Sequence, residues 1–414
     1  MIKYDRFCLD NGLRVLVHED KSTPLVAMNI LYDVGSRDED PGMTGLAHLF
    51  EHLMFGGSVN IPEYDMPLQM VGGENNAFTS NDITNYYLTV PSANIETGFW
   101  LESDRMLELD FSQKNLDTQK NVVIEEFNQR YLNQPYGDAI LKLRPLAYKV
   151  HPYRWPAIGM DISHIENTDL EQVKKFFFSH YAPDNAILAL TGNISYDLAF
   201  RLTQKWFGPI EKREVKSRKL PVEPVQNEER ILSIEKDVPS TALYKVWHIG
   251  PRDNMDFHTL DLITDLLAGG ESGRLHTKLV REKKLFSEIN AYLTSDIDPG
   301  LIIVQGKLMK DIDIQHAEEA VNEVIKNLQN RNGIKDEMEK VKNKFESSAV
   351  FSYTNILNKA VNLSFYELLG NPELINQEVD AYRKVSQEMV IEAARRYFVP
   401  SNCSTLYYKS TRKD

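Results

Sequence analysis

Cysteine is scarce in this chain, which has only two residues of this type among 414, Cys8 and Cys403. They stand near opposite ends of the sequence and neither is part of a C-x-x-C pair. The sequence therefore supports neither a disulfide framework nor a cysteine-ligated metal. We expect both side chains to be buried thiols.

Long hydrophobic runs are also missing. No uninterrupted stretch reaches the roughly 18 apolar residues that a transmembrane helix needs, so we expect no membrane span and no membrane partner. The first residues, Met1–Arg6, lack the apolar core of a secretory signal. We therefore expect a cytoplasmic protein, or an exported one whose leader has been removed.

Positive charge is in deficit. The 47 Lys and Arg residues are outnumbered by 60 Asp and Glu residues, which gives a net charge of −13. No basic patch or stripe stands out, and this argues against nucleic acid as a partner. The chain is 42% hydrophobic and 26% charged, as expected for a globular protein, and its length suits two domains.

A weak internal repeat supports this division. Tyr181–Leu188 recurs as Phe398–Thr405, and each copy follows an amphipathic helical segment and precedes an apolar strand. Asp20–Tyr32 has a counterpart in Asp237–Trp247. The sequence therefore predicts two copies of one α+β unit.

The join between the copies is a charged, proline-containing stretch without an apolar period. We predict a first domain over residues 1–212, a linker over 213–229 and a homologous second domain over 230–414, with the catalytic residues in the first.

Hydrophobic periodicity locates elements in both halves. Strand-like runs lie at Leu13–His18, Val26–Val34 and Tyr86–Pro91. Helical periods cover Asn94–Leu109, Asn115–Leu132, Phe257–Leu267, Arg274–Lys283, Ile312–Leu328 and Lys335–Leu369. Strands cluster and helices outnumber them, which predicts the α+β class: two α/β sandwiches, each with an antiparallel-rich sheet covered by helices.

One pentapeptide points to chemistry. In His48-Leu49-Phe50-Glu51-His52 the two histidines are four residues apart, so on a helix they share one face and can bind one zinc ion. Glu51 stands beside them, where it can reach a water on that metal. This H-x-x-E-H order is typical of the inverzincin type of catalytic zinc site.

The surrounding sequence favours a helix between Gly42 and Gly57. Apolar residues recur there at helical spacing, and a Gly-Gly pair follows. The histidines flank the apolar stripe. The alternative is an ordinary amphipathic helix whose two histidines are half-buried and bonded to carbonyl groups.

A catalytic zinc takes three protein ligands and keeps one position open, so a third ligand must come from elsewhere. Glu125 and Glu126 lie in an apolar-rich helical segment, where a buried carboxylate needs a partner. Spacing alone does not decide which of the two turns inward.

Three segments in order resemble the pitrilysin (insulinase-like) zinc peptidases, of the short processing-peptidase type. They are the pentapeptide at 48–52, Asn76-Ala77-Phe78-Thr79 with Asp82 and Thr84, and Val122-Val123-Ile124-Glu125-Glu126. The resemblance implies zinc ligands His48, His52 and Glu126, and Glu51 as the catalytic carboxylate. It extends into the second half through the repeat, through Ser272-Gly273-Arg274-Leu275 and through Val280-Arg281-Glu282-Lys283.

Two positions depart from that family. Two helical turns before Glu126 the family often has a second glutamate, and Gln119 stands there, able to form hydrogen bonds but not to carry charge. In the second half, active relatives hold the substrate backbone with an arginine and a tyrosine. Arg281 matches the arginine, but the tyrosine place falls at Ser287 or Glu288, and the nearby Tyr292 is out of register.

The resemblance implies a zinc endopeptidase of short or unstructured peptides. In some bacterial relatives one subunit holds the zinc and a homologous subunit supplies the arginine–tyrosine pair. The broken pair predicts that this chain is the zinc-bearing subunit of a two-chain enzyme, with a homodimer as the alternative. A different class, a non-catalytic scaffold subunit, remains as the competing interpretation.

The glycine-rich approach to Asn76 and Ala77 leads into strand-forming residues. An edge strand there could pair with an extended peptide through main-chain hydrogen bonds. An ordinary turn that enters a strand fits the composition equally well, and the resemblance favours substrate contact at Asn76 and Ala77.

Overall fold

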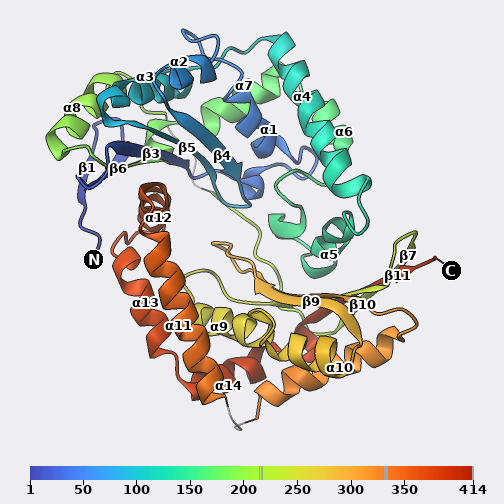
Figure 1. Ribbon diagram of the computed structural model, residues 1–414. Helices are drawn as coiled ribbons and strands as arrows, with labels where there is room; N and C mark the ends of the chain where they lie inside the picture. Colours follow the sequence, from blue (N-terminus) through green and yellow to red (C-terminus); the bar gives the residue numbers. More distant parts are fainter. Residues whose placement is uncertain (214, 216–217, 331–333, 413–414) are drawn as a thin grey trace. The chain divides into compact units, whose positions relative to one another are not determined.

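The computed structural model describes residues 1–213, 215, 218–330 and 334–412. The chain forms two compact units, each assembled from three separate stretches (Figure 1). Unit 1 contains Met1–Asn128, Trp155–Leu220 and Val350–Gln377. Unit 2 contains Gln129–Arg154, Pro221–Ala349 and the stretch from Glu378 to the C-terminus.

Unit 1 is built on a six-stranded sheet in the order β1-β2-β6-β3-β5-β4. The β2–β6 pair is parallel and the other neighbours are antiparallel. The strands are β1 (Asp5–Cys8), β2 (Arg14–Glu19), β3 (Leu25–Tyr32), β4 (Glu74–Thr79), β5 (Thr84–Pro91) and β6 (Ala186–Gly192). The edge strand β4 is the one on which the substrate contacts were predicted.

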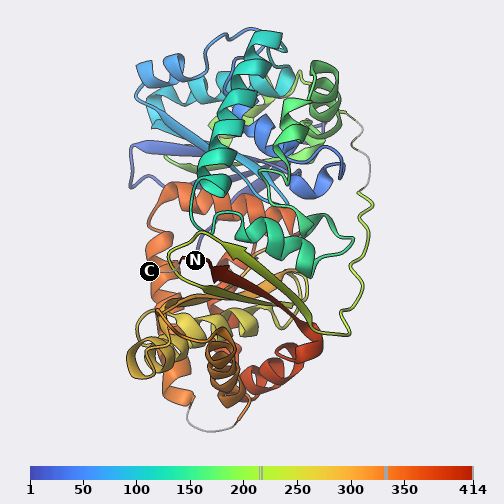
Figure 2. The same cartoon turned by 90° about the vertical axis from the view of Figure 1, so that its right-hand side faces the viewer.

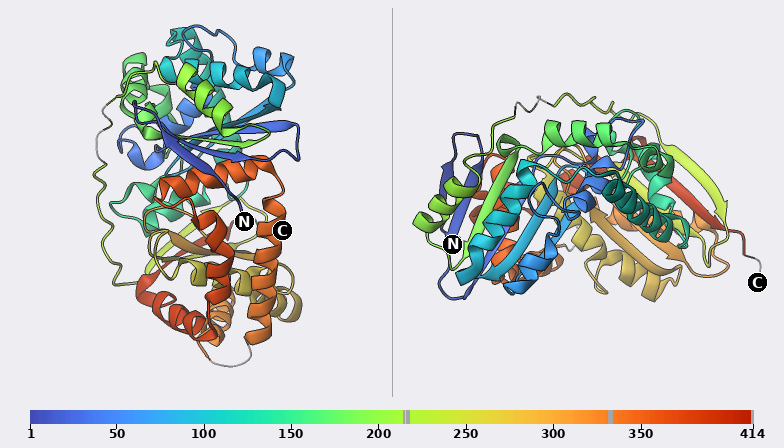
Figure 3. Two further views of the ribbon diagram at one scale, coloured as in Figure 1. Left: turned by 90° about the vertical axis from the view of Figure 1, so that its left-hand side faces the viewer. Right: turned by 90° about the horizontal axis from the view of Figure 1, so that it is seen from above.

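Helices cover both faces of this sheet, as Figure 2 and the left panel of Figure 3 show from the two sides. On one face are α1 (Leu46–Leu53), α2 (Asp65–Met70), α3 (Ile95–Leu107), α4 (Gln113–Phe127), α6 (Ile162–Glu166), α7 (Leu170–His180) and α8 (Tyr196–Trp206). On the other face α12 (Ile356–Leu368) packs against β2, β3 and β6.

Unit 2 repeats the arrangement with five strands in the order β7-β11-β8-β10-β9. Here β7–β11 is the parallel pair. The strands are β7 (Arg230–Lys236), β8 (Ala242–His248), β9 (Phe286–Leu293), β10 (Leu301–Leu308) and β11 (Cys403–Ser410). Its helices include α5 (Ala139–Ala147), α9 (Phe257–Ala268), α10 (Ile314–Leu328) and α14 (Gln387–Tyr397). The predicted α+β class with two helix-covered sheets is confirmed.

Each unit contains one helix from the half of the chain that forms most of the other unit. The segment after α4 carries α5 into unit 2, where α5 packs against β7, β8 and β11. Conversely, α11 (Lys335–Ser352) leads into unit 1, and α13 (Leu374–Lys384) leads back to unit 2. The ranges predicted from the sequence, 1–212 and 230–414, describe the repeat along the chain and stay a prediction.

Several sequence expectations need correction. The helical period over Lys335–Leu369 is not one helix, because it breaks after Ser352 and restarts at Ile356, where the Asn355 side chain accepts a hydrogen bond from the Leu357 amide. Of the two thiols, Cys403 is buried, but Cys8 is exposed near the end of the sheet-edge strand β1.

Two further segments predicted as α-helix are partly or wholly π-helical. The helical run expected to reach Leu132 is α-helical only to Phe127, and Asn128–Leu132 forms a π-helical turn. The segment His276–Glu282 is also π-helical rather than α-helical. Among the described residues, no helix combines the length and apolarity that crossing a bilayer requires.

Candidate metal centre

Helix α1 carries the pentapeptide and lies between α4 and β4. It is shorter than the predicted span from Gly42 to Gly57, because the chain before Gly45 forms a turn and the helix ends at Leu53. Its apolar face is fully buried and consists of Leu46, Ala47, Leu49, Phe50 and Leu53. Burial of this face leaves His48 and His52 directed toward α4.

The C-terminal side of α1 is fixed by a buried cation. The guanidinium of Arg105 on α3 forms an ion pair with Glu102 and lies over the rings of Phe55, Tyr64 and Tyr86. Arg105 is 1% exposed. Phe55 lies two residues after the end of α1. The cluster around Arg105 therefore fixes the position of the chain where it leaves the helix.

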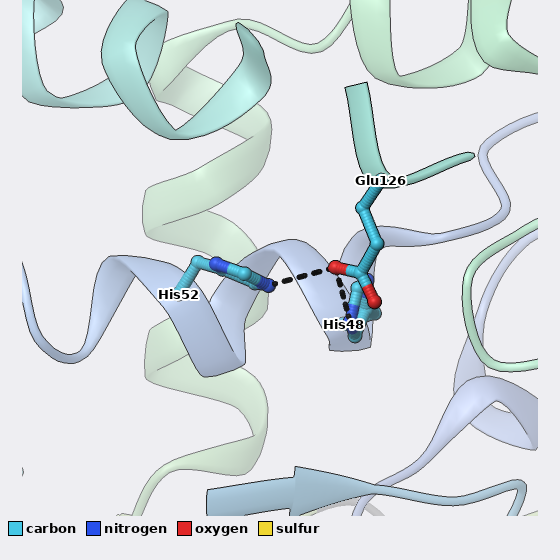
Figure 4. Close-up of side chains that lie close together, drawn as sticks. All are labelled: His48, His52 and Glu126. Atoms are coloured by element: carbon cyan, nitrogen blue, oxygen red, sulfur yellow. Dashed lines mark ion pairs between the residues drawn. The ribbon is translucent and has the colours of Figure 1, made fainter. Parts of the chain in front are cut away.

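Glu126 completes a three-residue cluster with the histidines. Its Oε2 atom lies 3.6 Å from Nε2 of His48 and 3.5 Å from Nε2 of His52 (Figure 4). One donor atom from each residue lies within 4.8 Å of the others. The side chains of His48, His52 and Glu126 are 12%, 25% and 20% exposed, so a ligand there would be shielded but still reachable.

This donor set suits zinc. Two ligand atoms that are about 2.0–2.2 Å from one tetrahedral zinc lie roughly 3.3–3.5 Å apart, which is close to the separations observed here. The same separations exceed the roughly 2.9 Å of an ordinary N–H···O hydrogen bond. Two imidazoles and one glutamate are also a donor set of catalytic zinc sites that keep a fourth position open.

Glu51 lies on the same helix, next to His52 in the sequence, and this helix packs against β4. Burial raises the pKa of the Glu51 carboxyl, and the neighbouring Thr79 on β4 offsets part of this rise. Glu51 therefore lies close to β4, the strand on which a substrate was predicted to bind.

The other residues singled out in the sequence occupy diverse positions. Glu125 is exposed, and Gln119 is half-buried on α4 two turns before Glu126. Asn76 is exposed on β4, and its Oδ1 atom accepts a hydrogen bond from the Ala77 amide at 2.8 Å. Arg281 is exposed on the π-helical turn of unit 2 and therefore does not belong to the same compact unit as the metal cluster.

Sequence reasoning missed one residue next to this centre. Glu39 is 7% exposed, and its carboxylate accepts hydrogen bonds from the backbone at the start of α1. The available signal was an acidic residue ahead of Gly45, in a stretch that offers no Ser, Thr, Asp or Asn at the helix N-cap itself.

Comparison with known proteins gives a consistent result. Residues 14–145 match the family model for insulinase (peptidase family M16), and residues 167–345 match the model for the peptidase M16 inactive domain. Zinc protease PqqE of Helicobacter pylori is 34% identical over 295 residues, which span 69% of this chain and 66% of that protein.

Two further similarities extend over nearly the whole chain. The uncharacterized zinc protease YmxG of Bacillus subtilis is 26% identical over 405 residues, or 96% of each chain. The crystal structure of a protease from Helicobacter pylori superposes with a TM-score of 0.93 at 26% identity, and covers 99% of this chain and 100% of that one.

Proposed function

The chain belongs to the insulinase family of peptidases (M16), and from this premise we propose that it is a zinc-dependent endopeptidase of short or unstructured peptides. The observation that carries the proposal is the convergence of His48, His52 and Glu126, with Glu51 on the adjacent helical position. His48 and His52 come from a single helical turn, and Glu126 comes from a different helix.

Each residue then has a defined task. His48, His52 and Glu126 would hold the ion through Nε2, Nε2 and a carboxylate oxygen. Bound zinc supplies Lewis-acid polarisation of a carbonyl and lowers the pKa of a water to roughly 7. Glu51 accepts the proton of the attacking water at its carboxylate and passes it to the nitrogen of the leaving amine.

The substrate is proposed to bind along β4 in extended form. β4 is an edge strand that pairs only with β5 among the described residues of unit 1, and an added peptide strand would extend the sheet. The Ala77 amide is occupied by the Asn76 side chain, which a substrate carbonyl would have to replace. Pairing of this kind needs a free peptide backbone, so we propose a preference for unfolded substrates.

We expect the purified protein to contain one zinc per chain and to cleave an unstructured peptide, and a chelator to abolish both. Glu126→Gln should lower zinc affinity by at least about tenfold, because an amide is a weak zinc ligand. Zinc is measured by atomic absorption and cleavage by mass spectrometry of the products.

The adjacent exposed Glu125 supplies the matched control, because Glu125→Gln removes the same charge one position away. It should retain both zinc and cleavage. If the protein were to take up no zinc and leave every unfolded peptide intact, the scaffold interpretation would replace this proposal.

We further propose that a homologous subunit completes the enzyme. Arg281 is exposed in unit 2, and the two positions where a partner tyrosine would be expected, Ser287 and Glu288, are exposed polar residues on β9. Tyr292 lies farther along the same strand and is 40% exposed.

Purification from the native source at natural abundance should yield a co-eluting homologue that mass spectrometry identifies and that has the arginine–tyrosine pair intact. Adding this homologue should raise peptide cleavage at least about tenfold, on the scale of catalytic positioning effects. Full activity of the isolated chain as a homodimer would contradict the two-chain arrangement.

A further inference from the structure

The helix with the zinc motif has no N-terminal cap of its own. Its N-cap residue is Gly45, at φ +90°, and no side chain at that position accepts a hydrogen bond from the first turn. The cap comes from Glu39 instead. Its Oε2 atom accepts a hydrogen bond from the Gly45 amide at 2.9 Å, and its Oε1 atom accepts one from the Ala47 amide at 2.8 Å.

The Glu39 carboxylate is also held by a hydrogen bond from a buried tryptophan. Trp155, 1% exposed, donates its indole N–H to Glu39 Oε2 at 3.1 Å and to the Ser36 carbonyl at 2.9 Å. A carboxylate with three N–H donors and little solvent around it has few alternative positions.

The backbone at Gly45 is equally constrained. A Cβ atom at this position would lie 2.6 Å from the carbonyl oxygen of Ile158. The neighbouring Thr44 is also fixed, because its amide donates to Nδ1 of His164 at 3.1 Å and its hydroxyl accepts from the Met160 amide at 2.9 Å. The loop around 155–164 therefore holds the start of α1 in place, and Glu39 supplies the carboxyl group that accepts from the amides of Gly45 and Ala47.

The consequence for the metal centre follows from the length of α1. The helix has eight residues, and His48 lies one turn or less from the capped end. A rotation of about 10° would move an imidazole nitrogen roughly 7 Å from the helix axis by about 1 Å, a displacement comparable with those that cost about 10²-fold in catalysis.

We propose that Glu39 is a positioning residue, which fixes the rotation of α1 and so places the imidazoles of His48 and His52 for zinc. The inference rests on the proposed function, because it assumes that these histidines bind metal. It adds a buried carboxylate that never touches the ion but sets the geometry of two of its three ligands.

Cobalt(II) provides the test, since its visible spectrum reports ligand geometry independently of catalysis. The full chain is stripped with a chelator and titrated with Co²⁺. Glu39→Gln should bind Co²⁺ about tenfold more weakly and change the shape of the absorption bands, because an amide NH₂ then faces one of the helix amides. Glu39→Asp retains the carboxyl group at a shorter reach and should recover part of the affinity.

Glu367→Gln is the matched control. Glu367 is a 1% exposed glutamate of the same unit that pairs with Arg6 on β1, away from α1. Its replacement should lower the unfolding midpoint without changing the cobalt spectrum. If Glu39→Gln lowered the midpoint equally and left affinity and spectrum unchanged, Glu39 would be purely structural and the inference would be overturned.

The proposed function and the positioning role of Glu39 fail in different ways. Should the unaltered protein bind no Co²⁺ at all, the proposed function fails and takes this inference with it. If it binds Co²⁺ normally and Glu39→Gln does too, only the positioning role is lost. Should Glu39→Gln not fold, unchanged cobalt affinity and spectrum in Glu39→Asp would still overturn the inference, since its shorter side chain cannot reach both amides.

Discussion

Replacement of Glu51 by glutamine is expected to lower kcat/KM for peptide cleavage by about 10³-fold while bound zinc stays at one ion per chain. The amide has almost the same shape as the carboxylate but cannot accept the proton of the attacking water, and proton transfer of this kind contributes roughly 10²–10⁴-fold. Cleavage of a fluorogenic unstructured peptide and the zinc content of the same sample measure the two effects.

Comparison with Glu126→Gln, at a proposed zinc ligand, shows whether the effect of Glu51→Gln is specific to proton transfer. Glu126→Gln should lose zinc together with activity, whereas Glu51→Gln should lose only activity, because Glu51 is not among the three clustered donors. Retained cleavage by Glu51→Gln would remove Glu51 from the mechanism. Loss of zinc from this variant would make Glu51 a ligand instead of a proton acceptor.

The second large effect concerns the exchanged helix. A fragment of residues 1–220, expressed alone, is expected to be unfolded, although it contains every strand of the first sheet and all three proposed ligands. It lacks α12, whose Ala360, Leu363 and Tyr366 are buried in one cluster with residues of β2, β3 and β6. Large apolar side chains contribute about 1.5–3 kcal/mol each, against a total of about 5–15 kcal/mol for a domain.

Polar contacts add to this loss. Asn29 on β3 is fully buried and donates to the Ser364 hydroxyl on α12 at 2.6 Å. Asp20 forms an ion pair with Lys359, 2.9 Å apart. Without α12, Asn29 loses this buried partner, and an unsatisfied buried polar group costs about 1–3 kcal/mol.

Circular dichroism and size-exclusion chromatography of the fragment measure the effect. The matched control is the full chain with a protease site at Val222. This residue is 88% exposed and lies in the sequence between β6 and β7. Once cut, its two pieces should remain folded and elute together, because each holds a segment that belongs to the unit of the other. A stable, monomeric 1–220 fragment would show that α12 is dispensable.

Much of the fold was accessible from the sequence because its hydrophobic patterns are local. The strand expected at Val26–Val34 appears as β3, Leu25–Tyr32, and the helix expected at Asn94–Leu109 appears as α3, Ile95–Leu107. The break at Tyr353–Asn355 was missed because apolar residues keep a helical period on both sides of it. The helix exchange has no local signal at all, since it depends on which sheet each helix packs against.

In the candidate metal centre, too, the sequence alone leaves the role of single residues undecided. Spacing along one helix paired His48 with His52, but it left Glu125 and Glu126 equivalent. The structure separates them, because Glu126 faces α1 whereas Glu125 is exposed. For Glu39 the sequence offers only an acidic residue ahead of Gly45, because its partners are the nearby amides of Gly45 and Ala47 and the indole of Trp155, 116 positions downstream.

The position of Glu126 also connects the proposed metal site to both units through the chain. Two residues after it, at Asn128, the chain leaves unit 1, and the following segment contributes α5 to the core of unit 2. Zinc held by the three proposed ligands would bind the native arrangement and not the unfolded chain, so its binding free energy would add to the free energy of unfolding. Because α4 is continuous with a segment packed in the other unit, that added free energy is thermodynamically linked to both sheets, and the loaded protein is expected to melt as one cooperative system.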